Sequence, residues 1–367
     1  MKMSETLQFD TTDIDGPLYN YLLISSRIGY ENASSTKSFW QLIKSYFFIC
    51  LYLIYIPKAI FLLFCDTSNS NLLIYLGDVF QVFEKAKPYT SYTIISMYIN
   101  IFLILLLFHL SSEHNLKWLS VIQILKGYGN WKSLNFKNVK TLKKFLSRAE
   151  LIIGKIVSKL AFIAISITSI CFLYLSFEFQ RKHVSFYFIN PWRIFDVILI
   201  YSFIGGRYVV YSYYYLICYK IKLELIDLKN EIDSVLSISS STISLSNRTI
   251  DKLLNQLAKI QISMNCYNRF WKKYLWFALF TSIPGHAFLL FCLINSSIKL
   301  SLLELICVIN EFIECNLISL FIFYPLFTIN THIKSLYKSY YQLLMLASVC
   351  CPSKYEKVNF NIFKLVF

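Results

Sequence analysis

Apolar runs of about twenty residues recur through this chain, and they constrain its fold more than any other feature. The run from 274 to 294 is typical: it is apolar all the way around a helix and is interrupted mainly by Thr281, Ser282 and His286. At a rise of about 1.5 Å per residue, about twenty such residues cross a hydrocarbon core about 30 Å thick. A basic collar at 269–273 precedes this run at one end only, which is typical of a membrane interface.

The composition also indicates a membrane protein. Of the 367 residues, 56% are hydrophobic and only 16% are charged, whereas a soluble protein is about one quarter charged. The net charge of +15 would suit nucleic acid, but a nucleic-acid-binding protein does not also carry several spans of Leu, Ile and Phe. We therefore predict an all-α, polytopic helical bundle that contacts the lipid bilayer and binds no nucleic acid.

Six segments are long and apolar enough to cross a membrane as helices. They are residues 45–65, 93–111, 152–177, 194–219, 274–294 and 302–329. The segment 71–83 is shorter and carries Asp78, so we place it outside the membrane. These spans define a bundle over 45–329, with an N-terminal segment at 1–44 and a C-terminal segment at 330–367.

Basic residues collect on one side of the predicted bundle. Loops 112–151 and 220–273 and the segment after 329 are rich in Lys and Arg, while the alternate loops carry little charge. Because basic loops stay in the cytoplasm, both termini are predicted to be cytoplasmic. The first residues lack the apolar core and the cleavage site of a signal peptide. We expect a multi-pass protein of the plasma membrane.

Both long basic loops have helical patterns. Apolar residues recur at helical spacing from 139 to 152, so the third span should continue into the cytoplasm. The same spacing from 223 to 236 extends the fourth span, and the serine-rich segment 234–249 ends it. A second helix, 250–276, then runs into the fifth span. We expect these extensions to pack below the bilayer and to make subunit contacts.

The sequence carries no pattern of an enzyme or a cofactor site. It lacks a Gly-rich phosphate loop, a nucleophile elbow and a His-x-x-x-His pair, and its five histidines are isolated. The ten cysteines have neither disulfide nor zinc spacing. We therefore predict no catalytic residue, no metal site and no cofactor. Polar residues inside the spans remain as functional candidates, because they are costly in lipid.

Spans four and five hold three such residues. Asp196 and Arg207 are eleven residues apart, which is three helical turns, so both lie on one face about 16 Å apart. Asp196 is near the outer end and is either hydrated or functional, whereas Arg207 is deeper and needs a partner or a watery cavity. His286 follows Pro284, so it either forms a hydrogen bond at a helix break or contacts a ligand.

Span six holds three acids, Glu304, Glu311 and Glu314, which share one helical stripe. Three carboxylates on one stripe do not face lipid together. In one interpretation Glu304 is interfacial and the other two bond to neighbouring helices. In the other, all three line a water-filled vestibule or a ligand pocket. The candidate ligand-pocket residues are therefore Asp196, Arg207, His286, Glu304, Glu311 and Glu314.

The layout of the spans and the segment before span five resemble the insect gustatory receptors, most of all the lepidopteran group assigned to bitter compounds. That segment is "LLNQLAKIQISMNCYNRFWKKYLWF", where Asn268, Phe270, Trp271, Lys272 and Lys273 match a pattern that precedes the fifth helix of those receptors. The resemblance covers most of residues 40–367. It implies a subunit of a homo- or hetero-tetrameric, ligand-gated cation channel that detects a small-molecule tastant. In that family the ligand pocket lies in the outer half of the bundle, and the last helix lines the pore.

The sequence departs from this family at its end. Gustatory receptors usually finish with a seventh helix that carries a Thr-Tyr and Gln-Phe pattern, whereas this sequence ends at "KVNFNIFKLVF". One alternative is therefore a truncated receptor that we expect not to conduct ions alone. Another is a secondary transporter of small solutes, in which Asp196, Arg207 and the span-six acids form a substrate or proton path. Tyr and Phe accept sugars and alkaloids alike, so the ligand stays open.

Overall fold

The computed structural model of the chain describes residues 39–64, 76, scattered positions between 91 and 106, and 139–182, 186–239, 247–295 and 302–350. Within these ranges the chain is helical and forms no strand, which confirms the predicted all-α fold. The segment before 39, most of the segment 71–83 and the residues after 350 lie outside the described part of the chain.

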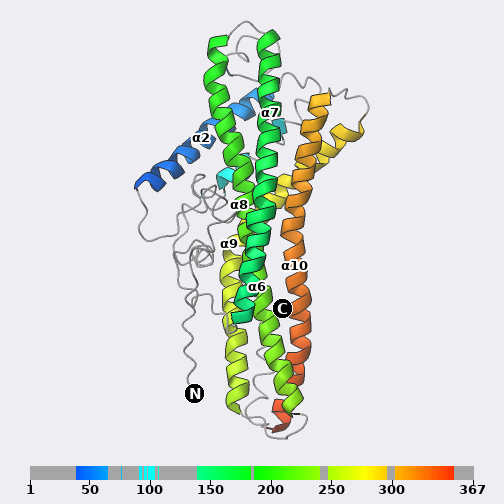
Figure 1. The fold of residues 1–367 in the computed structure, drawn as a ribbon. Helices are drawn as coiled ribbons and strands as arrows, with labels where there is room; N and C mark the ends of the chain where they lie inside the picture. The colour runs from blue at the N-terminus through cyan, green and yellow to red at the C-terminus, as the bar shows by residue number, and fades with distance from the viewer. Residues whose placement is uncertain are drawn as a thin grey trace.

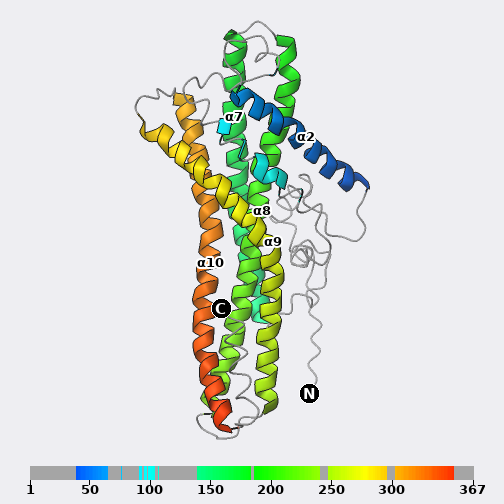
Figure 2. The ribbon, with the colours of Figure 1, turned by 180° about the vertical axis from the view of Figure 1, so that it is seen from behind.

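Long helices that alternate in direction form the bundle. Three of them, α8 (Phe186–Ser239), α9 (Asn247–Ile294) and α10 (Leu302–Cys350), run along most of the molecule (Figure 1). A further rod consists of α6 (Val139–Ala149), the π-helix η5 (Glu150–Val157) and α7 (Ser158–Lys182). Helix α2 (Phe39–Phe64) crosses the bundle obliquely, as the view from behind also shows (Figure 2).

Helix α8 is more enclosed than α2, the α6–α7 rod and α10. In its apolar stretch 72% of the residues are buried inside the bundle, against 28–33% in α2, the α6–α7 rod and α10. The outer helices present large apolar side chains to the surroundings. Phe162 on α7 is 71% exposed, and Leu320 on α10 is 63% exposed. Side chains of this kind, gathered on the outside of a helical bundle, are typical of a surface that contacts lipid.

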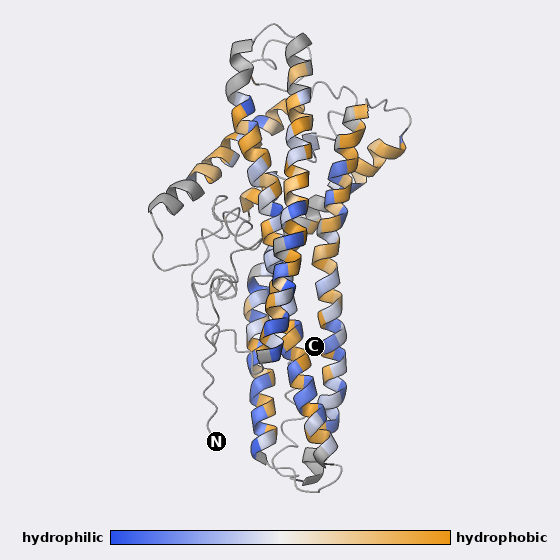
Figure 3. Cartoon of the chain, viewed as in Figure 1, coloured by the Kyte–Doolittle hydropathy of each residue, from blue (hydrophilic) through white to orange (hydrophobic). Residues whose placement is uncertain are grey.

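One half of the bundle is hydrophobic and the other half is hydrophilic (Figure 3). Among the described residues, four helices are long and apolar enough to cross a membrane, and they contain the predicted spans one, three, four and six. The fifth predicted span falls in α9, whose described residues give a shorter apolar stretch, Gly285–Ile294. The second is described only in part, and its described positions are helical.

The hydrophilic half contains the predicted continuations of the spans. Helix α8 passes residue 219 without a break and ends at Ser239, and α9 begins at Asn247 and runs into the fifth span. Both helical continuations are therefore confirmed, and residues 240–246 of the serine-rich segment between them lie outside the described part of the chain. The third span also continues as predicted, although a π-helix joins its two parts. Helix α10 passes residue 329 and ends at Cys350.

Apolar stripes hold the hydrophilic half together, as their spacing predicted. Phe145 of α6 is fully buried, and its ring stacks on Tyr219 of α8 with centroids 6.2 Å apart. Ile232 of α8 is also fully buried. A hydrogen bond supports this contact, because Thr141 Oγ1 donates to Asp227 Oδ1 at 3.0 Å. The chain thus presents a packed bundle beyond its apolar half.

Candidate functional site

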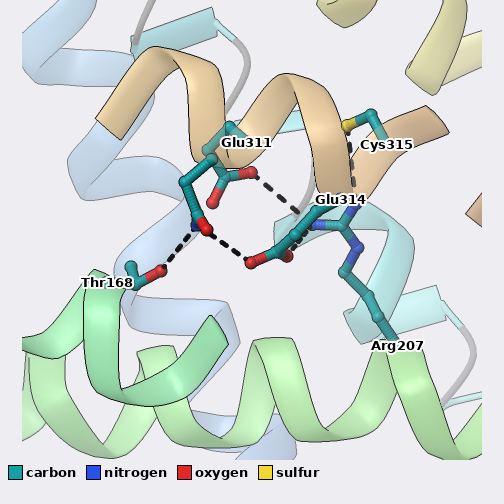
Figure 4. A network of polar contacts seen from close by, with 6 residues as sticks. Thr168, Arg207, Glu311, Glu314 and Cys315 are labelled. Atoms are coloured by element: carbon teal, nitrogen blue, oxygen red, sulfur yellow. Dashed lines mark hydrogen bonds and ion pairs between the residues drawn. The ribbon is translucent and has the colours of Figure 1, made fainter. Parts of the chain in front are cut away.

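Arg207 lies on α8 in the hydrophobic half of the bundle, and its side chain is only 8% exposed. It follows Gly205 and Gly206, small residues of the kind that allow neighbouring helices to approach closely. Its Nη1 atom lies 3.6 Å from Oε2 of Glu311 and 3.6 Å from Oε2 of Glu314, both on α10 (Figure 4). The structure therefore brings together three of the six predicted site residues.

Further polar side chains extend this contact. Asn310 Nδ2 donates to Glu314 Oε1 at 3.1 Å and to Thr168 Oγ1 of α7 at 3.5 Å. Arg207 Nη2 donates to Cys315 Sγ at 3.5 Å. These contacts link α7, α8 and α10. We call this group the Arg207 network, and its members are Thr168, Arg207, Asn310, Glu311, Glu314 and Cys315.

The Arg207 network holds two carboxyl groups but only one guanidinium. The Glu314 side chain is 3% exposed and that of Glu311 is 21% exposed. At 3.6 Å, both Oε2 atoms lie beyond the usual N–H···O hydrogen-bond distance of about 2.7–3.2 Å. One guanidinium therefore compensates the two carboxylates only in part. In a low-dielectric interior, a surplus carboxylate attracts a proton, a metal cation or the ammonium group of a ligand.

Asp196 belongs to a second cluster near the start of α8. It is 9% exposed and interacts with Tyr55 and Lys58 of α2. The Tyr55 hydroxyl donates to the Trp192 carbonyl oxygen at 3.2 Å. Lys58 Nζ lies 3.9 Å from the centroid of the Trp192 ring. Asp196 is thus buried against α2.

Aromatic side chains lie between the two clusters along α8. The Tyr98 ring has its centroid 5.9 Å from that of Tyr52 and 6.0 Å from that of Phe203. Tyr52 also donates to Ser202 Oγ of α8 at 3.3 Å. The Phe203 ring in turn lies 4.9 Å from the guanidinium carbon of Arg207. We call Tyr52, Tyr98 and Phe203 the aromatic row.

Of the remaining two predicted site residues, the structure describes one side chain, that of His286. His286 of α9 contacts Phe312 of α10, with ring centroids 6.5 Å apart in an edge-to-face arrangement. Glu304 belongs to α10, but its side chain lies outside the described part of the chain. Within the described residues, no group of three or more His, Cys, Asp or Glu side chains is placed to hold a metal ion.

Sequence reasoning missed several members of these clusters. Lys58 follows Pro57 inside the first predicted span, so the rule that selected Arg207 would also have selected it. Thr168 and Cys315 gave no such signal, because hydroxyl and thiol side chains are common in apolar helices. Their roles depend on which helices meet, and residue spacing within one helix does not specify that.

Comparisons with known proteins give a structural match and no sequence match. No protein-family model matches this chain, and no curated protein matches its sequence. The insect olfactory receptor OR5 from Machilis hrabei in complex with eugenol is similar in structure, with a TM-score of 0.70 and 14% identity over 94% of this chain and 88% of that chain. A second structure of OR5 from the same organism is similar with a TM-score of 0.60 and 13% identity, over 95% of this chain and 87% of that chain. At these identities the likeness shows the fold alone, an all-helical bundle like that of the olfactory receptor.

Proposed function

We propose that this chain is a chemoreceptor subunit of the plasma membrane that opens a cation channel when a small organic molecule binds. Its fold is similar to that of an insect olfactory receptor, one structure of which is a complex with eugenol. Its sequence layout resembles the insect gustatory receptors. That resemblance makes a tastant, in particular a bitter compound, the proposed ligand class. Assembly into a homo- or hetero-tetramer is part of the proposal.

The observation that carries this proposal is the burial of the Arg207 network. A bundle that only has to be stable gains little from such a group, because replacing a buried ion pair with well-packed apolar residues is often neutral or stabilising. Charged side chains inside membrane spans are therefore functional candidates by default. Since the Arg207 network joins α7, α8 and α10, a change in its charge or geometry would move these helices relative to one another.

The aromatic row and the Arg207 network suggest the chemistry of the ligand. The rings of Tyr52, Tyr98 and Phe203 favour a ligand with an apolar or aromatic body. The surplus carboxylate favours a ligand with a protonated amine. We therefore propose amine-bearing aromatic ligands, such as alkaloids, in preference to neutral sugars.

Thermal unfolding of the purified chain in detergent tests this ligand class. Aromatic amines should raise the unfolding temperature more than neutral alcohols of the same shape, since any ligand that binds the folded state stabilises it. The difference between amine and alcohol should disappear in the Glu311→Gln variant, which removes the surplus carboxylate. Equal stabilisation by amines and alcohols in the unaltered chain would contradict the proposed role of the Arg207 network.

The surplus carboxylate also suits a second candidate function, a secondary transporter that couples a proton to its substrate. Intramembrane Asp and Glu side chains form proton paths in such proteins. The two candidates differ in what crosses the membrane. A channel passes cations when its ligand binds outside, whereas a transporter accumulates the solute itself.

A further inference from the structure

A cavity of about 390 Å³ lies where the α6–α7 rod, α8 and α10 meet. Three cations and three phenol groups line it, namely Lys144, Arg148, Lys222, Tyr215, Tyr219 and Tyr324. Among the described residues that line this cavity, none is acidic. Its volume falls in the range of about 300–1,000 Å³ that is typical of small-molecule sites. We call it the basic cavity.

The wall of the basic cavity is built from packed side chains. The rings of Tyr215 and Tyr219 are stacked, with centroids 6.2 Å apart and an interplanar angle of 10°. The Phe145 ring stacks on the Tyr219 ring, with centroids 6.2 Å apart and an interplanar angle of 16°. The Arg148 guanidinium interacts with the Tyr215 hydroxyl. The adjoining turns of the rod are π-helical, a rare geometry that is frequent at functional sites. These contacts hold Tyr215, Tyr219 and Arg148 in defined positions.

Lys222 of the basic cavity differs from two other lysines in this half of the bundle. Lys220 lies 3.0 Å from Glu224, and Lys252 lies 3.2 Å from Glu231. By contrast, burial lowers the pKa of Lys222, and the neighbouring cations Lys144 and Arg148 lower it further. Like charges that line one cavity repel each other, and an anion bound there would relieve this repulsion.

The basic cavity also lies at a membrane interface. The predicted third span begins at 152, the fourth ends at 219 and the sixth ends at 329. The lining residues Arg148, Lys222 and Thr328 each lie within about one helical turn of those limits. This is the side predicted to be cytoplasmic, where the leaflet carries anionic lipids.

We propose that the basic cavity binds a phosphorylated inositol group, supplied as the headgroup of a lipid in the adjoining leaflet. Lys and Arg side chains form strong, charge-assisted hydrogen bonds with phosphate oxygens, and the tyrosine hydroxyls are further donors. Leu151, which also lines the cavity, is 41% exposed, so an acyl chain could leave the cavity along the apolar surface of the rod.

A bound headgroup would join the rod, α8 and α10, and α8 and α10 are the two helices that Arg207 connects to each other. Lipid composition would therefore set how firmly these helices are held together. The inference concerns a different site from the Arg207 network and depends only on the membrane placement of the chain. It can hold or fail independently of the proposed receptor function.

Binding is tested with the full chain reconstituted in phosphatidylcholine nanodiscs, with fluorescent phosphatidylinositol bisphosphate as the probe. We expect saturable binding that weakens about fivefold for each of Lys144→Gln and Lys222→Gln, since one basic residue near the surface contributes about that factor. Matched controls are Lys143→Gln and Lys272→Gln, which remove the same charge from exposed positions that do not line the cavity. These should change the affinity less than twofold.

A competition experiment distinguishes a lipid headgroup from a soluble inositol phosphate as the source of the phosphorylated group. Soluble inositol trisphosphate is added to the same nanodiscs and should compete at least tenfold more weakly than the lipid, because it lacks the contribution of the acyl chains. Equal competition would overturn the lipid source. Absence of saturable binding, or equal losses in the cavity variants and the control variants, would overturn the site itself.

Discussion

Arg207 and Glu314 belong to different long helices, yet Nη1 of the arginine lies 3.6 Å from Oε2 of the glutamate, with the two side chains 8% and 3% exposed. Each charge is therefore held in the bundle by the other. Glu311 shares the same guanidinium and is more exposed, at 21%. This asymmetry separates a structural pair, Arg207 with Glu314, from a second carboxylate that can respond to a ligand or a proton.

Replacing Arg207 with methionine should destabilise the chain strongly. The change leaves the buried carboxylate of Glu314 and the half-buried one of Glu311 without their cation, and breaking a buried pair in this way costs about 3–5 kcal/mol. Thermal unfolding of the purified protein in detergent measures the loss. Lys252→Met is the matched control, because its side chain is 66% exposed and its ion pair with Glu231 should contribute less than about 1 kcal/mol.

Two further substitutions test whether this loss of stability is electrostatic. Adding Glu311→Gln and Glu314→Gln to Arg207→Met removes the uncompensated charges, so most of the lost stability should return. Without any recovery, the loss would have to come from the packing of the arginine side chain, and the electrostatic interpretation would be wrong.

Neutralising Glu311 alone should have a small effect on stability. The Glu311→Gln variant keeps the shape of the side chain and leaves one carboxylate for one guanidinium. We expect a change of less than about 1 kcal/mol in either direction, well below the effect of Arg207→Met. Unfolding curves for the two variants, recorded side by side, check this order. A loss as large as that of Arg207→Met would mean that Glu311 is the structural partner.

Phe145 tests the packing of the hydrophilic half. Its side chain is fully buried and stacks on Tyr219. Truncation to alanine should therefore cost about 3–5 kcal/mol through lost contacts and a cavity. Limited proteolysis within α6 should become faster, whereas Lys143→Ala, at an exposed position of the same helix, should leave the rate unchanged. Equal rates in both variants would show that α6 is not packed on α8 as described.

The predicted orientation places both ends of the chain in the cytoplasm, because the basic loops and the C-terminal segment lie on one side. Epitope tags added to each end should be detected only after the cells are permeabilised. An extracellular tag on a folded control receptor verifies that intact cells can be stained. Surface staining of either terminal tag would contradict the orientation.

Much of the fold could be predicted from the sequence because the signals are local. Apolar periodicity from 223 to 236 predicted that α8 continues past residue 219, and the helix in fact extends to Ser239. The π-helix at Glu150–Val157 was not predicted, since nothing in its composition distinguishes it from the α-helices that it joins.

The candidate site could be predicted only in part. Glu311 and Glu314 were selected with Arg207 because charges are rare in apolar spans, and the structure brings these three together. Which acid lies deeper was not predictable, because it depends on the rotation of α10 against α8. His286 was selected by the same reasoning, yet it contacts Phe312 and lies outside the Arg207 network.

Ligand-evoked cation influx is the most direct test of the proposed receptor function. The chain is expressed in cells together with a receptor subunit of similar architecture, and influx is recorded while aromatic amines are applied outside. We predict influx that requires this chain and that disappears in the Glu311→Gln variant at an unchanged surface level. Accumulation of the labelled amine inside the cells, driven by a proton gradient and without any evoked cation current, would contradict the receptor function and identify a transporter.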